Sequence, residues 1–91
     1  LLKSPHSQER YWLAVAMSVS RSQQSYNDLL KLIEDKNTNV RSMAFHSLGV
    51  RNNRQAVKPI LEKIRLSPDW YAQLYAYRSL RSLGWKQKKS P

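Results

Sequence analysis

The sequence predicts an all-α fold, an α-solenoid of stacked antiparallel helical hairpins with about five helices. Only two glycines and four prolines occur among the 91 residues, of which 41% are hydrophobic, a balance typical of ordered helical chains. Apolar residues recur at helical spacing, and no stretch alternates with the period of a strand. One amphipathic pattern also recurs at a nearly fixed interval along the chain. Such repetition is typical of hairpins that bury their apolar stripes against one another.

We expect five helices over about 5–19, 22–35, 37–49, 53–66 and 68–84, followed by a basic tail at 85–91. Capping residues predict where the first three begin. Ser4 should cap the first helix, with Pro5 in its first turn, where the missing N–H costs nothing. Ser22 should cap the second helix, and Asn37 or Thr38 the third.

Glycine and proline predict the helix ends and one irregular start. Gly49 is placed where a left-handed residue would end the third helix, and Gly84 where one would end the fifth. Pro59 is costly inside a helix, so the fourth should begin regularly near Gln55 or later, or bend at Pro59.

The repeat is visible when the chain is aligned with itself. Aligning segment 8–33 with segment 39–64 superimposes Arg10 on Arg41, Leu29 on Ile60, and Ile33 on Ile64. Aligning segment 37–48 with segment 69–80 superimposes Asn37 on Asp69, Ala44 on Ala76, and Leu48 on Leu80. Gln73 takes the place of the repeated arginine in the third copy, which suggests a terminal cap or a specialised unit.

The repeated residues resemble HEAT repeats, and most closely the short bacterial form also found in phycobilin lyases. The resemblance covers roughly residues 8–85 and rests on the segments 29–35, 39–41, 48–49 and 56–61, together with Ala44. It implies an unpaired inner helix at 5–19 and hairpins at 22–49 and 53–84. It also implies a scaffold that binds a protein partner or another domain of its parent chain.

Length and composition limit the class of protein. Ninety-one residues predict a single domain over 1–91, and a start at Leu1 rather than methionine suggests a piece excised from a longer protein. The chain has no cysteine, which excludes disulfides, thiolate zinc sites and a cysteine nucleophile. Its longest apolar run, Leu13 to Met17, is far too short to cross a membrane. This composition favours the cytoplasm over secretion.

The fifth predicted helix carries the candidate binding site. At 100° per residue, its packing face should consist of Ala72, Ala76, Leu80 and Leu83. Aromatic and arginine side chains, which dominate binding hot spots, occupy the other two faces: Trp70, Tyr71, Tyr75, Tyr77, Arg78 and Arg81. The alternative is that these faces are buried against neighbouring repeats.

Charge supports a second interpretation. The net charge is +10, and residues 51–91 carry +8 of it. The basic patch we expect there consists of Arg51, Arg54, Lys58, Lys63, Lys86 and Lys88. Such a patch could contact the phosphates of a nucleic acid, and the tail could lie near an anionic membrane surface. The simpler alternative is a solvated outer face.

An ion pair should connect successive helices. Arg10 and Arg41 recur at one position of the repeat, and Asp35 precedes Arg41 by six residues. We expect the carboxylate at the end of the second helix to meet Arg41 in the first turn of the third. This role is structural.

Catalysis finds little support in the sequence. No pair of acids, phosphate-binding loop or nucleophile motif is present, and His6 and His46 lack the second ligand that a metal face needs. We therefore expect no cofactor, no metal and no enzyme activity. The least favoured interpretation, a fragment of a chromophore lyase or DNA glycosylase, has only Asp69 beside Trp70 to support it.

Overall fold

The computed structural model describes residues 3–52, 54–66 and 70–85. It contains five α-helices: α1 (Ser7–Met17), α2 (Gln23–Leu32), α3 (Thr38–Val50), α4 (Val57–Leu66) and α5 (Trp70–Ser82). A short 3-10 turn, Arg54–Ala56, precedes α4. No strand occurs within the described ranges. The predicted all-α solenoid with five helices is confirmed.

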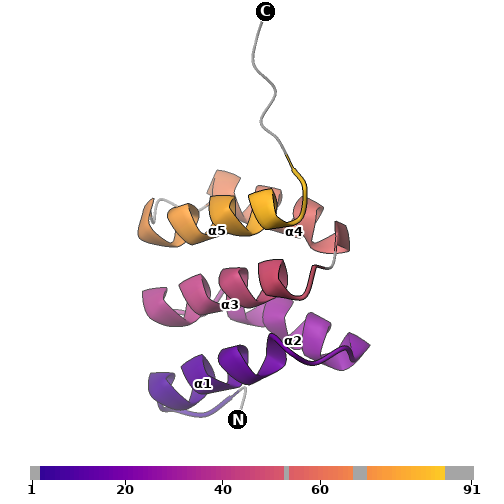
Figure 1. Cartoon of the computed structure of the whole chain (residues 1–91). Coiled ribbons are helices and arrows are strands. Elements are labelled where there is room, and N and C mark those ends of the chain that lie inside the picture. Colours follow the sequence, from indigo (N-terminus) through magenta and orange to yellow (C-terminus); the bar gives the residue numbers. More distant parts are fainter. Residues whose placement is uncertain (1–2, 53, 67–69, 86–91) are drawn as a thin grey trace, which may run out of the picture.

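The helices form two layers (Figure 1). We call α1, α3 and α5 the inner layer; they lie one above the other and run in the same direction. The outer layer, α2 and α4, lies behind them. The central helix α3 packs against both α1 and α5. The predicted succession of one inner helix and two hairpins is therefore the observed one.

The apolar stripes meet between these layers. Leu29 and Ile60, which superimpose in the repeat, are both fully buried. The predicted packing face of α5 is also confirmed, because Ala72, Ala76, Leu80 and Leu83 are at most 3% exposed. The hydrophobic core is thus continuous from α1 to α5.

The predicted caps are confirmed at α2 and α3. The Ser22 hydroxyl accepts from the Ser25 N–H, and the Asn37 side chain accepts from two N–H groups in the first turn of α3. The prediction at α1 is wrong. The N-cap is His6, and Ser4 instead accepts from the His6 N–H at 3.2 Å and donates to Glu9 at 2.9 Å.

Several helices are shorter than predicted. The turns after α1 and α2 tighten into i to i−3 hydrogen bonds, such as that from the Asp35 N–H to the Leu32 carbonyl at 3.0 Å. At the fourth helix, the 3-10 turn places Pro59 in the first turn of α4, so no interior bend is needed. The predicted start of the fifth helix at 68–69, and residues 86–91 of the predicted tail at 85–91, lie outside the described residues.

Gly84 ends α5 as predicted. Its φ is 90°, and the Trp85 N–H donates to the Leu80 carbonyl while the Gly84 N–H donates to the Arg81 carbonyl. These are the two hydrogen bonds of a Schellman motif. The left-handed conformation at this position strongly favours glycine.

The prediction for Gly49 is wrong. Gly49 lies inside α3 and is buried, and the left-handed residue after this helix is Asn52, with a φ of 57°. Gly49 is needed for packing instead. A Cβ built at this position would lie 2.9 Å from the Ser79 Oγ and 3.0 Å from the Ser79 Cα. The absence of a side chain allows α3 and α5 to approach each other closely.

A buried ion pair joins α1 to the end of α2. Arg10 donates to both carboxylate oxygens of Asp35, at 2.7 and 3.2 Å, and to the Ser4 carbonyl at 2.6 Å. Both side chains of the pair are at most 9% exposed. The prediction that the Asp35 carboxylate meets Arg41 is wrong, because the carboxylate pairs with Arg10 of α1, and Arg41 instead donates to the Asp35 backbone carbonyl at 2.7 Å. The repeated arginine thus binds the equivalent preceding carbonyl in both units.

Burial and hydrogen bonding oppose each other at the Asp35 carboxylate. Burial alone would raise the pKa of Asp35, but hydrogen bonds from Arg10 and the Asn37 N–H, together with the charges of Arg10 and Lys36, lower it below its ordinary value. The carboxylate therefore remains ionised and paired at neutral pH.

We predict that Gly49→Ala destabilises the chain by about 1–3 kcal/mol, because the new methyl group must push α3 away from α5. The measurement is the urea midpoint of unfolding. The double variant Gly49→Ala with Ser79→Ala should recover part of the loss, since it removes the nearest atom. Stability equal to that of the unchanged chain would contradict the packing role of Gly49.

We predict that Asp35→Asn lowers the free energy of unfolding by about 2 kcal/mol at pH 7, because it leaves the Arg10 charge buried without its carboxylate. A carboxylate whose pKa is lowered by folding stabilises the folded chain in full above its ordinary pKa of about 4. This stabilisation is lost as the pH falls through the pKa that the carboxylate has in the folded chain. The difference between the two chains should therefore shrink below about pH 4. Glu62→Gln, which removes an exposed charge on α4, is the control and should change stability little at either pH.

Candidate partner-binding site

The inner layer carries a hollow of about 380 Å³ near the start of its three helices. We call it the tyrosine hollow. Its lining comes from the first two turns of α1, α3 and α5 and consists of Ser7, Gln8, Tyr11, Asn37, Asn39, Ser42, Met43, Tyr71 and Tyr75. Because no single helix could form this surface, stacking of all three units is what creates it.

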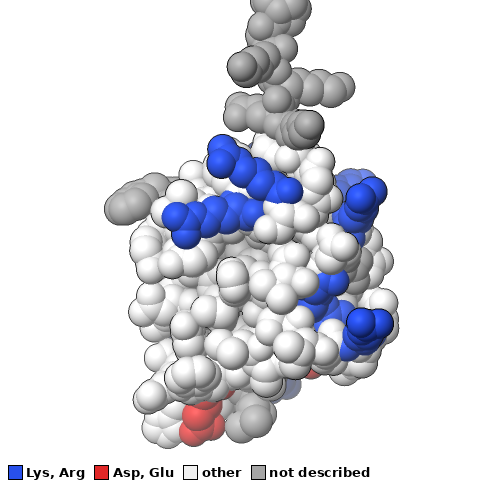
Figure 2. All heavy atoms as spheres, in the orientation of Figure 1, with Lys and Arg blue, Asp and Glu red and all other residues white. Residues whose placement is uncertain are grey.

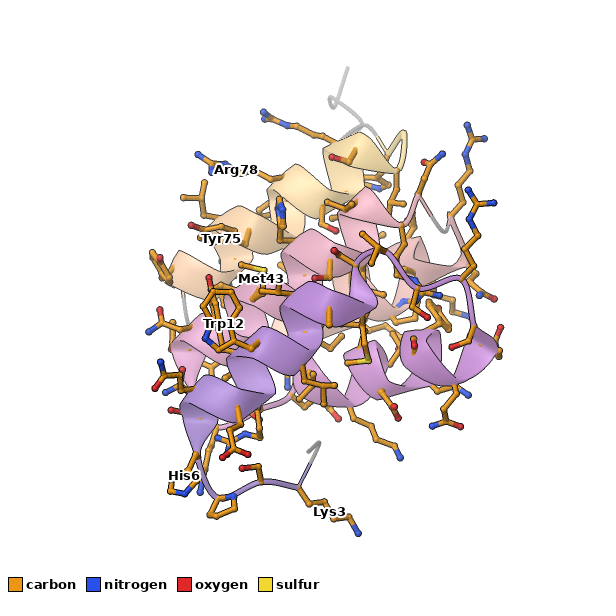
Figure 3. The ribbon with its side chains drawn as sticks, turned by 60° about the horizontal axis from the view of Figure 1, so that its bottom comes forward. Lys3, His6, Trp12, Met43, Tyr75 and Arg78 are labelled. Atoms are coloured by element: carbon orange, nitrogen blue, oxygen red, sulfur yellow. The ribbon has the colours of Figure 1, made fainter. Side chains whose placement is uncertain are left out.

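The walls of the tyrosine hollow are aromatic. The rings of Tyr71 and Tyr75 meet edge to face with centroids 5.4 Å apart, and the Arg78 guanidinium lies 5.6 Å from the Tyr75 ring centroid. On the opposite side, Tyr11 packs edge to face on Trp12, also at 5.4 Å. Figure 3 shows Trp12, Met43, Tyr75 and Arg78 along one edge of the molecule, from α1 across α3 to α5.

The hydroxyl groups of these tyrosines interact with one another. A hydrogen bond with Tyr75 raises the pKa of Tyr71, and the proximity of Tyr75, burial, and Tyr11 raise it further. A tyrosine hydroxyl is protonated at neutral pH even without such a shift, so the Tyr71 hydroxyl has a proton to donate.

The structure divides the predicted site into two surfaces. Tyr71, Tyr75 and Arg78 belong to the tyrosine hollow or its rim. Tyr77 and Arg81 face away from it, where Tyr77 lies 6.2 Å from the Trp85 ring and both side chains are exposed. The side chain of Trp70 lies outside the described residues. The five predicted residues whose side chains the structure describes therefore lie on two faces of α5 and do not form one site.

We call the second surface, formed by Leu74, Tyr77, Arg81 and Trp85, the α5 end surface. The position of this surface in the repeat explains why its side chains are exposed. Aligning the third unit with the second superimposes Tyr77 on Phe45, which is buried, and Arg81 on Gly49. Tyr77 is 37% exposed and Leu74 43%. The α5 end surface is therefore the stacking side of the third unit, carrying an arginine where the second unit needs a glycine.

The predicted basic patch is also divided. Arg51 is half-buried and donates to the backbone carbonyls of Met17 and Ser22, at 3.3 and 3.0 Å. Lys63 lies 3.7 Å from a Glu34 carboxylate oxygen. Arg54 and Lys58 are exposed, whereas Lys86 and Lys88 lie outside the described residues. Part of the patch thus serves the fold.

Charge is distributed unevenly over the surface. Figure 2 shows basic side chains above α5 and along the right-hand edge, while the middle of the face over the inner layer is uncharged. The helices of the inner layer begin on the left in this view and end on the right. The tyrosine hollow therefore lies away from most of the basic side chains.

Sequence reasoning missed the contributions of α1 and α3 to the site. It assigns none of Tyr11, Asn39, Ser42 and Met43 to a binding site. The repeat does indicate that α1 and α3 contribute to the site. Aligning all three units superimposes Gln8, Asn39 and Tyr71, and all three line the tyrosine hollow.

The described residues contain no group of three or more His, Asp or Glu side chains that could hold a metal ion. No helix within the described ranges is long and apolar enough to span a bilayer.

Comparison with known proteins identifies the family. A family model described as HEAT repeats matches residues 1–87. Searches among curated proteins and among solved structures each gave no significant match. HEAT repeats commonly mediate protein interactions or scaffolding, and the family is generally non-catalytic. With two layers of stacked hairpins and a match over nearly its whole length, the chain belongs to the HEAT-repeat family.

Proposed function

We propose that the chain is a non-catalytic binding module that holds a protein partner, or another domain of its parent chain, in the tyrosine hollow. The observation that carries this proposal is the hollow itself, which is lined by side chains from all three inner helices. Tyrosine supplies a large contact area at a low cost in conformational entropy, and arginine is the other residue type typical of hot spots.

The surroundings of the tyrosine hollow support a protein partner. Its lining mixes aromatic rings with amide and hydroxyl groups, which is the composition of protein interfaces rather than of phosphate sites. None of the described residues that line it is a lysine or an arginine. A nucleic acid would need such side chains at the contact surface to neutralise its phosphates.

The rival proposal is a nucleic-acid module that uses the basic side chains outside the hollow. Exposed basic residues on and before α4, such as Arg54, Lys58 and Arg65, favour it. The internal roles of Arg51 and Lys63 weigh against it, because a side chain held by the fold is less available to phosphate.

We predict that Tyr75→Ala with Arg78→Ala reduces partner binding at least roughly 30-fold, as loss of a hot-spot pair would. The measurement is recovery of proteins by the immobilised chain, with identification and affinity determination of those recovered. Tyr77→Ala with Arg81→Ala is the matched control, since it removes the same residue types from another face of α5. Helical circular dichroism should be the same for both variants. Equal loss in the two variants, or none in the first, would refute the site.

We predict that duplex and single-stranded oligonucleotides bind only weakly at low salt and not measurably at physiological salt. Contact between exposed basic side chains and phosphates releases counterions, so such affinity falls steeply with salt concentration. Fluorescence anisotropy at two salt concentrations measures this. Tight binding that persists at physiological salt and is lost in Arg54→Gln with Lys58→Gln would establish the rival function instead.

A further inference from the structure

We propose that the tyrosine hollow binds the carboxylate side chain of an acidic segment in the partner protein. This inference rests on the proposed function, because it specifies the chemistry that the same site recognises. Three features of the described residues carry it: a buried hydroxyl without a partner, a field of positive sign, and a lining of neutral donors.

The buried hydroxyl belongs to Ser42. This residue is 4% exposed, lines the tyrosine hollow, and its Oγ has no hydrogen-bond partner among the described residues. An unpaired buried hydroxyl is costly, and an acceptor in the hollow would remove that cost once the Ser42 side chain rotates, because its Oγ is closed to solvent in the free chain.

Two other buried serines show what is unusual about Ser42. Ser47 donates to the Ala14 carbonyl at 2.6 Å and is therefore satisfied within the fold. Ser79 also has no partner among the described residues, but it faces Gly49 at the contact between α3 and α5. Ser42 is the one of the three that both lines the hollow and lacks a partner.

The field at the tyrosine hollow favours an anion. Its lining comes from the first two turns of three helices that run in the same direction, so the positive ends of three helix dipoles lie beside it, of which that of α1 is partly offset by the exposed Glu9. No described lining residue is acidic, and Arg78 lies over the Tyr75 ring at the rim. A cationic ligand would find no counter-charge in this lining.

The donors favour a carboxylate over a phosphate. Phosphate recognition in proteins relies on arginine or lysine, often in bidentate pairs, and the described lining has neither. Tyrosine and serine hydroxyls with the amides of Gln8 and Asn39 can donate several neutral hydrogen bonds. With about 380 Å³ the hollow can take a glutamate or aspartate side chain together with some of the backbone that carries it.

The test uses a short peptide of alternating glutamate and glycine and its glutamine counterpart, titrated at physiological salt into the isotope-labelled chain. We expect the glutamate peptide to shift the amide resonances of Asn39, Ser42 and Tyr71, and to bind at least roughly tenfold more tightly than the glutamine peptide. Ser42→Ala should weaken glutamate binding roughly tenfold. Ser79→Ala, the other buried serine without a partner, should leave it unchanged.

Several outcomes would overturn the inference. The first three are no binding of the glutamate peptide, equal affinity for the two peptides, and resonance shifts confined to α4. The others are a Ser42→Ala variant that binds the glutamate peptide as tightly as the unchanged chain, and a phosphoserine counterpart that binds the hollow more tightly than the glutamate peptide. The inference and the proposed function can fail separately. If the glutamate peptide fails while Tyr75→Ala with Arg78→Ala still abolishes partner recovery, only the carboxylate chemistry is wrong. If the peptide binds while that variant recovers partners normally, only the proposed function is wrong.

Discussion

The close contact between successive inner helices is the constraint on which the rest of the molecule depends. Small residues make it: Ala14 lies under Ser47, whose hydroxyl bonds the Ala14 carbonyl, and Gly49 lies against Ser79. Because these contacts hold α1, α3 and α5 side by side, their first turns meet and form the tyrosine hollow. The contacts that stabilise the solenoid and those that shape its candidate site are therefore the same.

Much of the fold followed from local chemistry. The apolar stripe of α2, the caps Ser22 and Asn37, and the left-handed Gly84 each depend on residues within one or two turns, so sequence spacing was enough to predict them. The repeat then predicted which stripes face one another, since two similar units bury their faces in similar ways. The packing face of α5 was predicted correctly for that reason.

The features that could not be predicted from the sequence depend on contacts between residues of different helices. Gly49 has the position of a helix end in the sequence, but its role comes from Ser79, which belongs to another helix. Asp35 is close to Arg41 in the sequence, and nevertheless its carboxylate pairs with Arg10. The aromatic residues of α5 form one cluster in the sequence and two surfaces in space, because helical phase separates Tyr75 from Tyr77. The residues that α1 and α3 contribute to the site could have been predicted only by aligning the three units position by position.

The contact between Gly49 and Ser79 has a consequence for how recognition could be tuned. Neither residue lines the tyrosine hollow, and both lie near the other end of their helices, yet their contact is one of those that bring α3 and α5 close together. A methyl group added at Gly49 would push the two helices apart at this contact while leaving every side chain that lines the hollow in place. If the hollow binds a partner as proposed, its width therefore depends on core residues that never touch that partner.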